Sequence, residues 1–172
     1  MKYHQGLIIR LVLLFLPAAL LSFILTPLTV YAVKYLLFAY APVVTDRSLV
    51  INNIGFNFVE ACIATYAYLF LWYLCLLTKG IKLITRTKII VYGFLLIFLM
   101  NIFRIVLLII LGVDYGFYWF NVVHLFFWKF LSGVYVALVW IFLVKIYNIK
   151  GIPVYDDLKT LYKDSLFRKH RR

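Results

Sequence analysis

The sequence predicts an all-α integral membrane protein: a bundle of about four transmembrane helices, with both termini in the cytoplasm and a short extracellular β-hairpin before the second span. The first observation is composition, because hydrophobic residues make up 66% of the 172 residues and the mean hydropathy is +1.02. The second is a set of windows of about 20 apolar residues, which cross a bilayer as helices because lipid offers the backbone no other partners. These windows predict spans at residues 8–28, 58–78, 89–111 and 122–146.

The third observation is the distribution of lysine and arginine, which orients the bundle. Two lie in residues 1–10, four in residues 79–88 and eight from Lys145 onward, so 14 of the 18 occupy segments that an N-in, C-in bundle leaves in the cytoplasm. Cytoplasmic segments of membrane proteins carry this excess of basic residues. The net charge of +12 is therefore explained without nucleic acid, and the basic tail is expected to contact anionic membrane lipids.

We expect one polytopic membrane domain over residues 1–150 and a basic cytoplasmic tail over residues 151–172, with a short surface helix in the tail. Between Pro27 and Pro42 the chain is too short for a further span and contains Lys34. We expect this segment to extend the first helix or to lie along the membrane interface.

The next segment, VVTDRSLVINNIGFNFV, has β-branched and aromatic residues around an Asn-Asn-x-Gly turn signal. This pattern predicts an extracellular hairpin that leads directly into the second span. The NFVE that follows the turn is typical of a capping box, in which Asn57 accepts from backbone amides and Glu60 reaches back three residues.

The two cysteines lie near opposite ends of the second span. Cys62 and Cys75 are 13 residues apart, which on a helix separates them by about 20 Å. They are too far apart for a disulfide, and the spacing is not that of a zinc site. We expect no metal and no cofactor.

Polar and ionisable side chains inside the predicted spans indicate function, because an arginine at the centre of a membrane helix costs about 2.5–3.5 kcal/mol. Arg104 lies about 10 Å below the outer end of the third span. Cys62 and His124 each lie about one turn below the same surface, and Asn101 is one turn from Arg104 on the same helix face. We therefore expect these groups to converge in the outer leaflet, with Asn101 holding the guanidinium.

Each residue also has a simpler interpretation. A buried cysteine is commonly a packing residue, which is how we interpret Cys75 and how Cys62 would be read alone. His124 alone suits an interhelical hydrogen bond, and Arg104 alone suits a side chain that snorkels to headgroups. Lys129 lies about 140° around the helix from His124, so it is expected to snorkel or to pair elsewhere.

Together, the three groups predict acyl transfer on a peptide at the outer membrane surface. A thiolate is the nucleophile, and a helix N-terminus and nearby cations favour that form. His124 would take the thiol proton from Cys62 and return it to a leaving amine. Arg104 stays protonated, so its role would be to stabilise the thiolate or the oxyanion.

At these residues the sequence resembles the exosortase/archaeosortase family of membrane-embedded cysteine transpeptidases. The likeness covers about residues 48–146: an outer hairpin, EAC at the start of a span, a basic inner loop, NIFR in the next span and a histidine early in the last. The resemblance implies Cys62 as nucleophile, Arg104 as its electrostatic partner and His124 as the third member, with Asn101 in support.

The resemblance also implies the substrates and the location. The substrates would be secreted proteins with a C-terminal recognition motif, a transmembrane helix and a basic end, and the new C-terminus would pass to a lipid or other acceptor. The active site would face the outside of the plasma membrane. The chain departs from the family in its length, which is closer to the small archaeal type, and in having Ile63 and Ala64 where the family has a small hydroxyl residue and glycine.

Two other function classes are compatible with the composition. One is a small transporter or channel subunit in which Arg104 and His124 line an ion path. The gathering of these groups in one leaflet disfavours it, because a path needs polar residues toward the inner side as well. The other is a noncatalytic scaffold that binds partner helices through its aromatic surface, for which Cys62→Ser would leave function intact.

Overall fold

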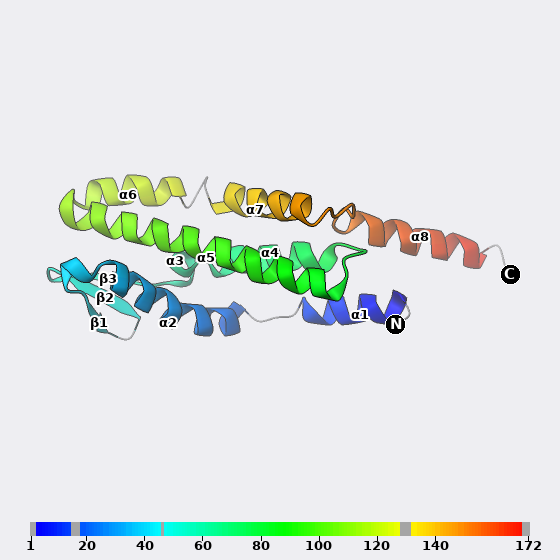
Figure 1. The fold of residues 1–172 in the computed structure, drawn as a ribbon, viewed down its shortest axis with the longest axis horizontal. Coiled ribbons are helices and arrows are strands. Elements are labelled where there is room, and N and C mark those ends of the chain that lie inside the picture. Colours follow the sequence, from blue (N-terminus) through cyan, green and yellow to red (C-terminus); the bar gives the residue numbers. More distant parts are fainter. Residues whose placement is uncertain (1–2, 15–17, 46, 128–131, 170–172) are drawn as a thin grey trace.

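The computed structural model describes residues 3–14, 18–45, 47–127 and 132–169. These residues are mostly helical, with one small three-stranded sheet. The helices are α1 (Tyr3–Leu13), α2 (Ala18–Leu36), the 3₁₀ turn η1 (Phe38–Tyr40), α3 (Glu60–Ile63), α4 (Thr65–Leu77), α5 (Leu83–Asp114), α6 (Phe117–Phe126), α7 (Ser132–Ile146) and α8 (Tyr155–Lys169). They run along one long axis, with the sheet at one end of the molecule and α1 and α8 at the other (Figure 1).

Two of these helices, α2 and α5, are long and apolar enough to cross a membrane. Helix α5 contains the predicted third span and extends beyond it at both ends. Helices α4 and α7 are apolar but shorter. Within the described residues, two candidate membrane-spanning helices are therefore present, and the total of four spans stays a prediction.

The predicted first span, residues 8–28, is not one helix. Helix α1 ends at Leu13, and α2 begins at Ala18 and continues to Leu36. Residues 15–17 lie outside the described part, and the sequence has Pro17 there, a residue that lacks the N–H a continuous helix needs. Of the two expectations for the segment after Pro27, extension of the first helix is confirmed.

The predicted second span is also divided, and the predicted fourth span includes residues 128–131, which lie outside the described part of the chain. Residues 58–78 form the single turn α3 and then α4, because Ala64 between them has a left-handed backbone with φ 60°. Residues 122–146 form the end of α6 and all of α7. Lys129 lies between these two helices, outside the described residues.

The predicted hairpin is confirmed, and a third strand joins it. Strands β1 (Val43–Thr45), β2 (Ser48–Ile51) and β3 (Ile54–Asn57) form an antiparallel sheet in the order β1-β2-β3. Asn52 and Asn53 connect β2 to β3 with φ 50° and 63°, the positive values that a two-residue hairpin turn needs and that asparagine tolerates.

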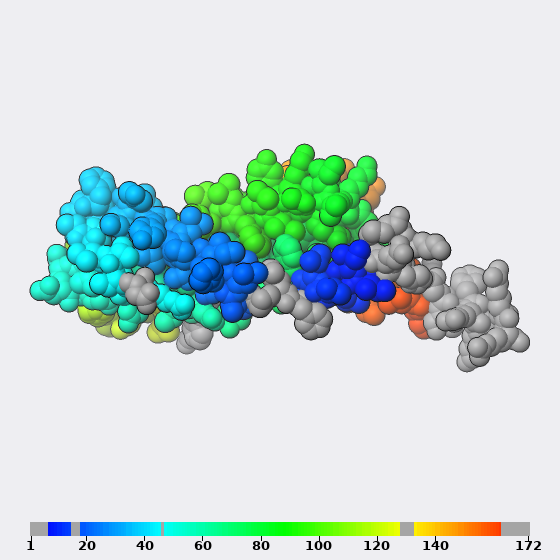
Figure 2. Space-filling view, turned by 90° about the horizontal axis from the view of Figure 1, so that it is seen from below, coloured from blue at the N-terminus to red at the C-terminus, as the bar shows by residue number. Residues whose placement is uncertain are grey.

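Two apolar clusters hold the elements together. The cluster nearer α1 packs α2, α4, α5 and α7, and its buried members include Tyr68, Leu71, Ile97 and Val136. The cluster at the sheet end packs α2, the sheet and α5, and includes Val33, Leu49, Ile51, Phe58 and Ile105. Figure 2 shows α2 (blue) beside the sheet (cyan) and α5 (green) on one face of the molecule.

Large apolar side chains remain exposed on the outward faces of the two long helices. Phe23 on α2 is 73% exposed and Phe103 on α5 is 58% exposed. Exposure of this kind along helices of spanning length is what a lipid-facing surface requires.

Polar contacts stabilise the packing of the elements at each end of the bundle. At the end away from the sheet, Arg10 pairs with Asp157 at 2.9 Å and also donates to the carbonyl of Leu76, so α8 is held against α1 and α4. The predicted tail helix is therefore present and has a buried contact. At the sheet end, the Tyr40 hydroxyl donates to Asp114 at 2.6 Å, which raises the pKa of Tyr40.

Candidate active site

Cys62 lies on α3, an isolated helical turn between the sheet and α4. The turn begins at Glu60 and ends at Ala64, whose N–H donates to the Glu60 carbonyl. The amides of Cys62 and Ile63 both donate to the Val59 carbonyl, at 2.8 and 3.2 Å. Cys62 therefore does not lie on one continuous helix over the predicted span 58–78, because a new helix starts after the left-handed residue Ala64.

The predicted capping box is also wrong. Asn57 is the last residue of β3, and the residue before α3 is Val59, which makes no side-chain cap. The strand continues one pair further, since the Phe58 amide donates to the Arg47 carbonyl at 2.9 Å. Sheet pairing therefore occupies the residues that a capping box would have used. Glu60 instead accepts from the Tyr66 hydroxyl at 3.5 Å and is exposed.

Arg104 reaches from α5 to the α3 turn. Its Nη2 donates to the carbonyls of Ala61 and Cys62, at 3.1 and 2.9 Å. Carbonyls at the end of a helical turn have no helical donor, so the guanidinium completes the turn that carries Cys62. The residue is 7% exposed, and its side chain points into the protein rather than to the surface, unlike a snorkelling arginine.

His124 is presented by α6, which folds back along the end of α5. Phe117, Phe120 and His124 follow one another at helical spacing and share one face, and the Phe120 and His124 rings stack with centroids 5.6 Å apart. The two helices approach closely at Gly112, where an added Cβ would lie 3.3 Å from Phe120 and 3.4 Å from Phe56. Within the part of the chain that is described, the buried Nδ1 of His124 has no hydrogen-bond partner.

Cys62, Arg104 and His124 line one pocket of about 230 Å³. The remaining wall comes from β3 and the residue after it, from α5 and from α6: Gly55, Phe56, Asn57, Phe58, Ile105, Leu108, Ile109, Phe117 and Phe120. The structure thus brings the three predicted catalytic residues together from α3, α5 and α6. The pocket is mostly apolar, with the thiol, the guanidinium and the imidazole as its ionisable groups.

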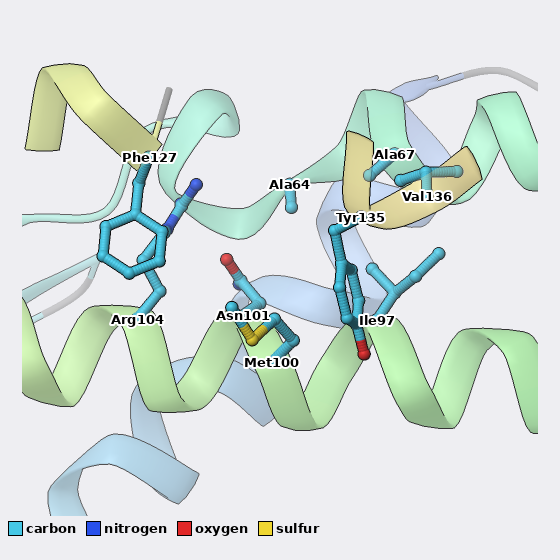
Figure 3. A pocket seen from close by; sticks show the side chains of 9 residues that line it. All are labelled: Ala64, Ala67, Ile97, Met100, Asn101, Arg104, Phe127, Tyr135 and Val136. Atoms are coloured by element: carbon cyan, nitrogen blue, oxygen red, sulfur yellow. The ribbon is translucent and has the colours of Figure 1, made fainter. Parts of the chain in front are cut away.

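Asn101 does not reach this pocket. It is 4% exposed and lines a second, smaller cavity of about 40 Å³, where Figure 3 shows it one turn from Arg104 on α5. Arg104 lines both cavities. Both amide atoms of Asn101 and the Nε of Arg104 lack a hydrogen-bond partner among the described residues. The expected direct bond from Asn101 to the guanidinium is therefore not formed.

Cys75 behaves as the packing residue that the sequence predicted. It is fully buried on α4, and its thiol contacts the Arg86 carbonyl at 3.8 Å. No group of three or more His, Cys, Asp or Glu side chains within the described ranges is placed to hold a metal ion.

Sequence reasoning missed most of the pocket wall. The spacing of Phe117, Phe120 and His124 on one helix face is a signal that could have identified the α6 wall. The presence of Gly55 and Asn57 in the pocket wall could not have been predicted. It depends on the strand order, which places β3 at the edge of the sheet next to Cys62. Comparison with known proteins found no matching protein family, no matching curated protein and no matching solved structure.

Proposed function

We propose that this protein is a membrane-embedded cysteine transpeptidase that cleaves C-terminal sorting signals of secreted proteins and transfers the new C-terminus to an acceptor. The observation that carries the proposal is the common pocket of Cys62, Arg104 and His124. Each of these residues has a simple structural explanation on its own. A nucleophile, a fixed cation and a proton carrier on three separate elements around one pocket are what acyl transfer requires.

In the proposed topology the chain crosses the membrane four times: with α2, with α4, with α5, and with α6 and α7 together. The three lysine- and arginine-rich segments belong to α1, the start of α5 and the chain from the end of α7, which lie at one end of the molecule (Figure 1). The positive-inside rule assigns that end to the cytoplasm. The sheet and the pocket then face outside.

The proposed reaction begins when the Cys62 thiol gives its proton to the His124 imidazole. The sulfur attacks the scissile carbonyl, and the carbonyl oxygen becomes an oxyanion. When the C–N bond breaks, the imidazolium returns its proton to the leaving amine, and the substrate is held as a thioester on Cys62. An acceptor hydroxyl or amine then attacks the thioester, giving its proton through His124 back to the sulfur.

Arg104 has two parts in this proposal. Its bonds to the carbonyls of Ala61 and Cys62 hold the nucleophile's turn in place. Its charge, 7% exposed and therefore weakly screened, stabilises the thiolate and the developing oxyanion.

The proposed substrates carry a C-terminal recognition motif, a transmembrane helix and a basic end, as the family resemblance implies. A substrate helix that lies in the bilayer beside the bundle brings its outer end to the depth of the pocket. A lipid is the proposed acceptor, since a lipid headgroup is present at the same depth.

Interception of the thioester tests the function. In cells that express the wild-type chain, added hydroxylamine is expected to replace the natural acceptor, because it attacks thioesters and forms hydroxamates. Mass spectrometry of the C-terminal peptides of surface proteins should then find hydroxamates at the new C-termini, and none in cells that express Cys62→Ala. Processing that continues in hydroxylamine without any hydroxamate would contradict a thioester intermediate.

Replacing His124 by alanine is expected to slow processing by about 10²–10⁴-fold, the usual contribution of a general acid–base group. The pH–rate profile should also change, because the part of the pH dependence that arises from protonation of the His124 imidazole should disappear. Measurement of both the rate and the profile, with His124→Gln as a variant of similar size, separates proton transfer from packing. A His124→Ala enzyme with the wild-type profile would remove this residue from the mechanism.

A further inference from the structure

β3 is an edge strand whose open side faces the pocket. Among the described residues, the sheet order β1-β2-β3 leaves β3 paired on one side only. Gly55 and Asn57 of this strand line the same pocket as Cys62. An open strand edge beside a nucleophile is a place where an extended peptide can bind.

The register shows which backbone groups point to the open side. Phe58 donates to the Arg47 carbonyl, so Phe58 and Arg47 form a hydrogen-bonded pair. Hydrogen-bonded and non-hydrogen-bonded pairs alternate along an antiparallel ladder. Since Asn57 is opposite Ser48 and Gly55 is opposite Val50, both are non-hydrogen-bonded, and their N–H and C=O groups point away from β2.

The nucleophile lies beside one of these groups, the carbonyl of Asn57. The Cys62 sulfur is 4.0 Å from the Asn57 carbonyl oxygen. Among the described residues, the Cys62 thiol is the group that contacts the outward carbonyl of Asn57. A peptide strand hydrogen-bonded to this edge would therefore pass next to the Cys62 sulfur, which could attack one of the peptide's carbonyl groups.

The pocket also has room for such a strand and for its side chains. Gly55 is exposed, and an added Cβ there would meet no heavy atom within 4 Å. The opposite walls are apolar: Ile105, Leu108 and Ile109 from α5, and Phe117 and Phe120 from α6. In a strand, alternate side chains point to the same side, so every second residue of the peptide would face this apolar wall.

We propose that the open edge of β3 binds the substrate as an added strand, an extended peptide with an apolar residue at the position that enters the pocket. This inference rests on the proposed function and adds how the substrate is recognised. Backbone hydrogen bonds to Gly55 and Asn57 place the scissile carbonyl at Cys62. A lipid acyl chain would fill the apolar part of the pocket but has no donors or acceptors for the outward backbone groups of Gly55 and Asn57.

The test compares a peptide reagent with a small one on Cys62. The reagents are acetyl-Leu-Ala-Phe chloromethyl ketone and iodoacetamide, and alkylation of Cys62 is followed by mass spectrometry in purified protein. Gly55→Pro removes one outward N–H without removing a ladder bond to β2, a substitution that edge strands tolerate. Loss of one such hydrogen bond, about 1.4 kcal/mol, is expected to slow the peptide reagent about 10-fold. Alkylation by iodoacetamide should be unchanged.

Gly55→Ala is the matched control, because it keeps the N–H and adds a methyl group to open space. The peptide reagent should react about 10-fold faster with Gly55→Ala than with Gly55→Pro, because the alanine variant keeps the N–H. Iodoacetamide should react at the same rate with the two variants. A second measurement needs no variant: N-methylation of the two inner amides of the peptide reagent, one at a time, should impair alkylation at one position and spare the next. Equal effects at both positions, or a Gly55→Pro protein that retains the wild-type preference for the peptide reagent, would overturn strand binding.

The two proposals fail in different ways. If strand binding is wrong, the rate at which the peptide reagent alkylates Cys62 is the same in Gly55→Pro and Gly55→Ala. Thioester interception by hydroxylamine still succeeds in that case. If the proposed function is wrong, interception fails in cells that express the wild-type chain, and the substrate inference falls with it.

Discussion

Replacing Cys62 by serine is expected to abolish the processing of C-terminal sorting signals, lowering the rate by about 10³-fold or more, as loss of a covalent nucleophile does. The hydroxyl has nearly the size of the thiol but is a far weaker nucleophile beside an imidazole. Cys62 is only half-buried, and its thiol makes one long contact at 4.0 Å. Folding and membrane insertion should therefore be unaffected, so a loss of rate would reflect chemistry.

The measurement is mass spectrometry of surface-protein C-termini in cells whose only copy of this protein is the variant. Cys75→Ser is the control, because it makes the same chemical change on α4 outside the pocket. It is expected to lower stability, since Cys75 is fully buried, yet to preserve processing per inserted molecule. Normal processing by correctly inserted Cys62→Ser would instead favour the scaffold interpretation.

The hairpin and the long helix α5 could be predicted because their signals are local. Two asparagines in succession tolerate the positive φ values of a tight turn, and they adopt them at positions 52 and 53. The apolar run through Arg104 is long enough to be a helix without reference to any neighbour. The meeting of Cys62, Arg104 and His124 in one pocket was predicted from their similar positions relative to the ends of the predicted spans.

The break at Ala64 could not be predicted, because its cause is tertiary. Alanine is the best helix former, and no glycine or proline marks the site. A left-handed alanine costs about 1–2 kcal/mol, which other contacts must offset. The guanidinium of Arg104 provides two of them, on carbonyls that the break leaves without helical donors. That partner is more than 40 residues away in the sequence.

Ala64 has the backbone conformation that the sequence resemblance would assign to a glycine. At φ 60° and ψ 32° it lies in the left-handed region that favours glycine. We therefore expect Ala64→Gly to keep the turn that carries Cys62.

Replacing Arg104 by methionine is expected to reduce processing by at least about 10²-fold, the usual cost of losing a preorganised donor at a developing charge. Methionine fills much of the same space but has neither the charge nor the donors, so the carbonyls of Ala61 and Cys62 lose their partner. Arg104→Lys should recover little, because an ammonium group lacks the planar fork of donors. The rate is measured per inserted molecule, from the same surface-protein C-termini.

Helix α5 offers a closely matched control at its other end. Arg86 also donates through Nη2 to a backbone carbonyl, that of Thr78 at 3.0 Å, and its Nε, like that of Arg104, lacks a partner within the described residues. If an arginine on α5 matters only because it completes the end of a neighbouring helix, Arg86→Met and Arg104→Met should lower stability and processing alike. If the charge beside Cys62 participates in the reaction, both variants should lose stability, but only Arg104→Met should lose processing per inserted molecule. Equal losses would reduce Arg104 to a structural residue and leave acyl transfer without its electrostatic partner.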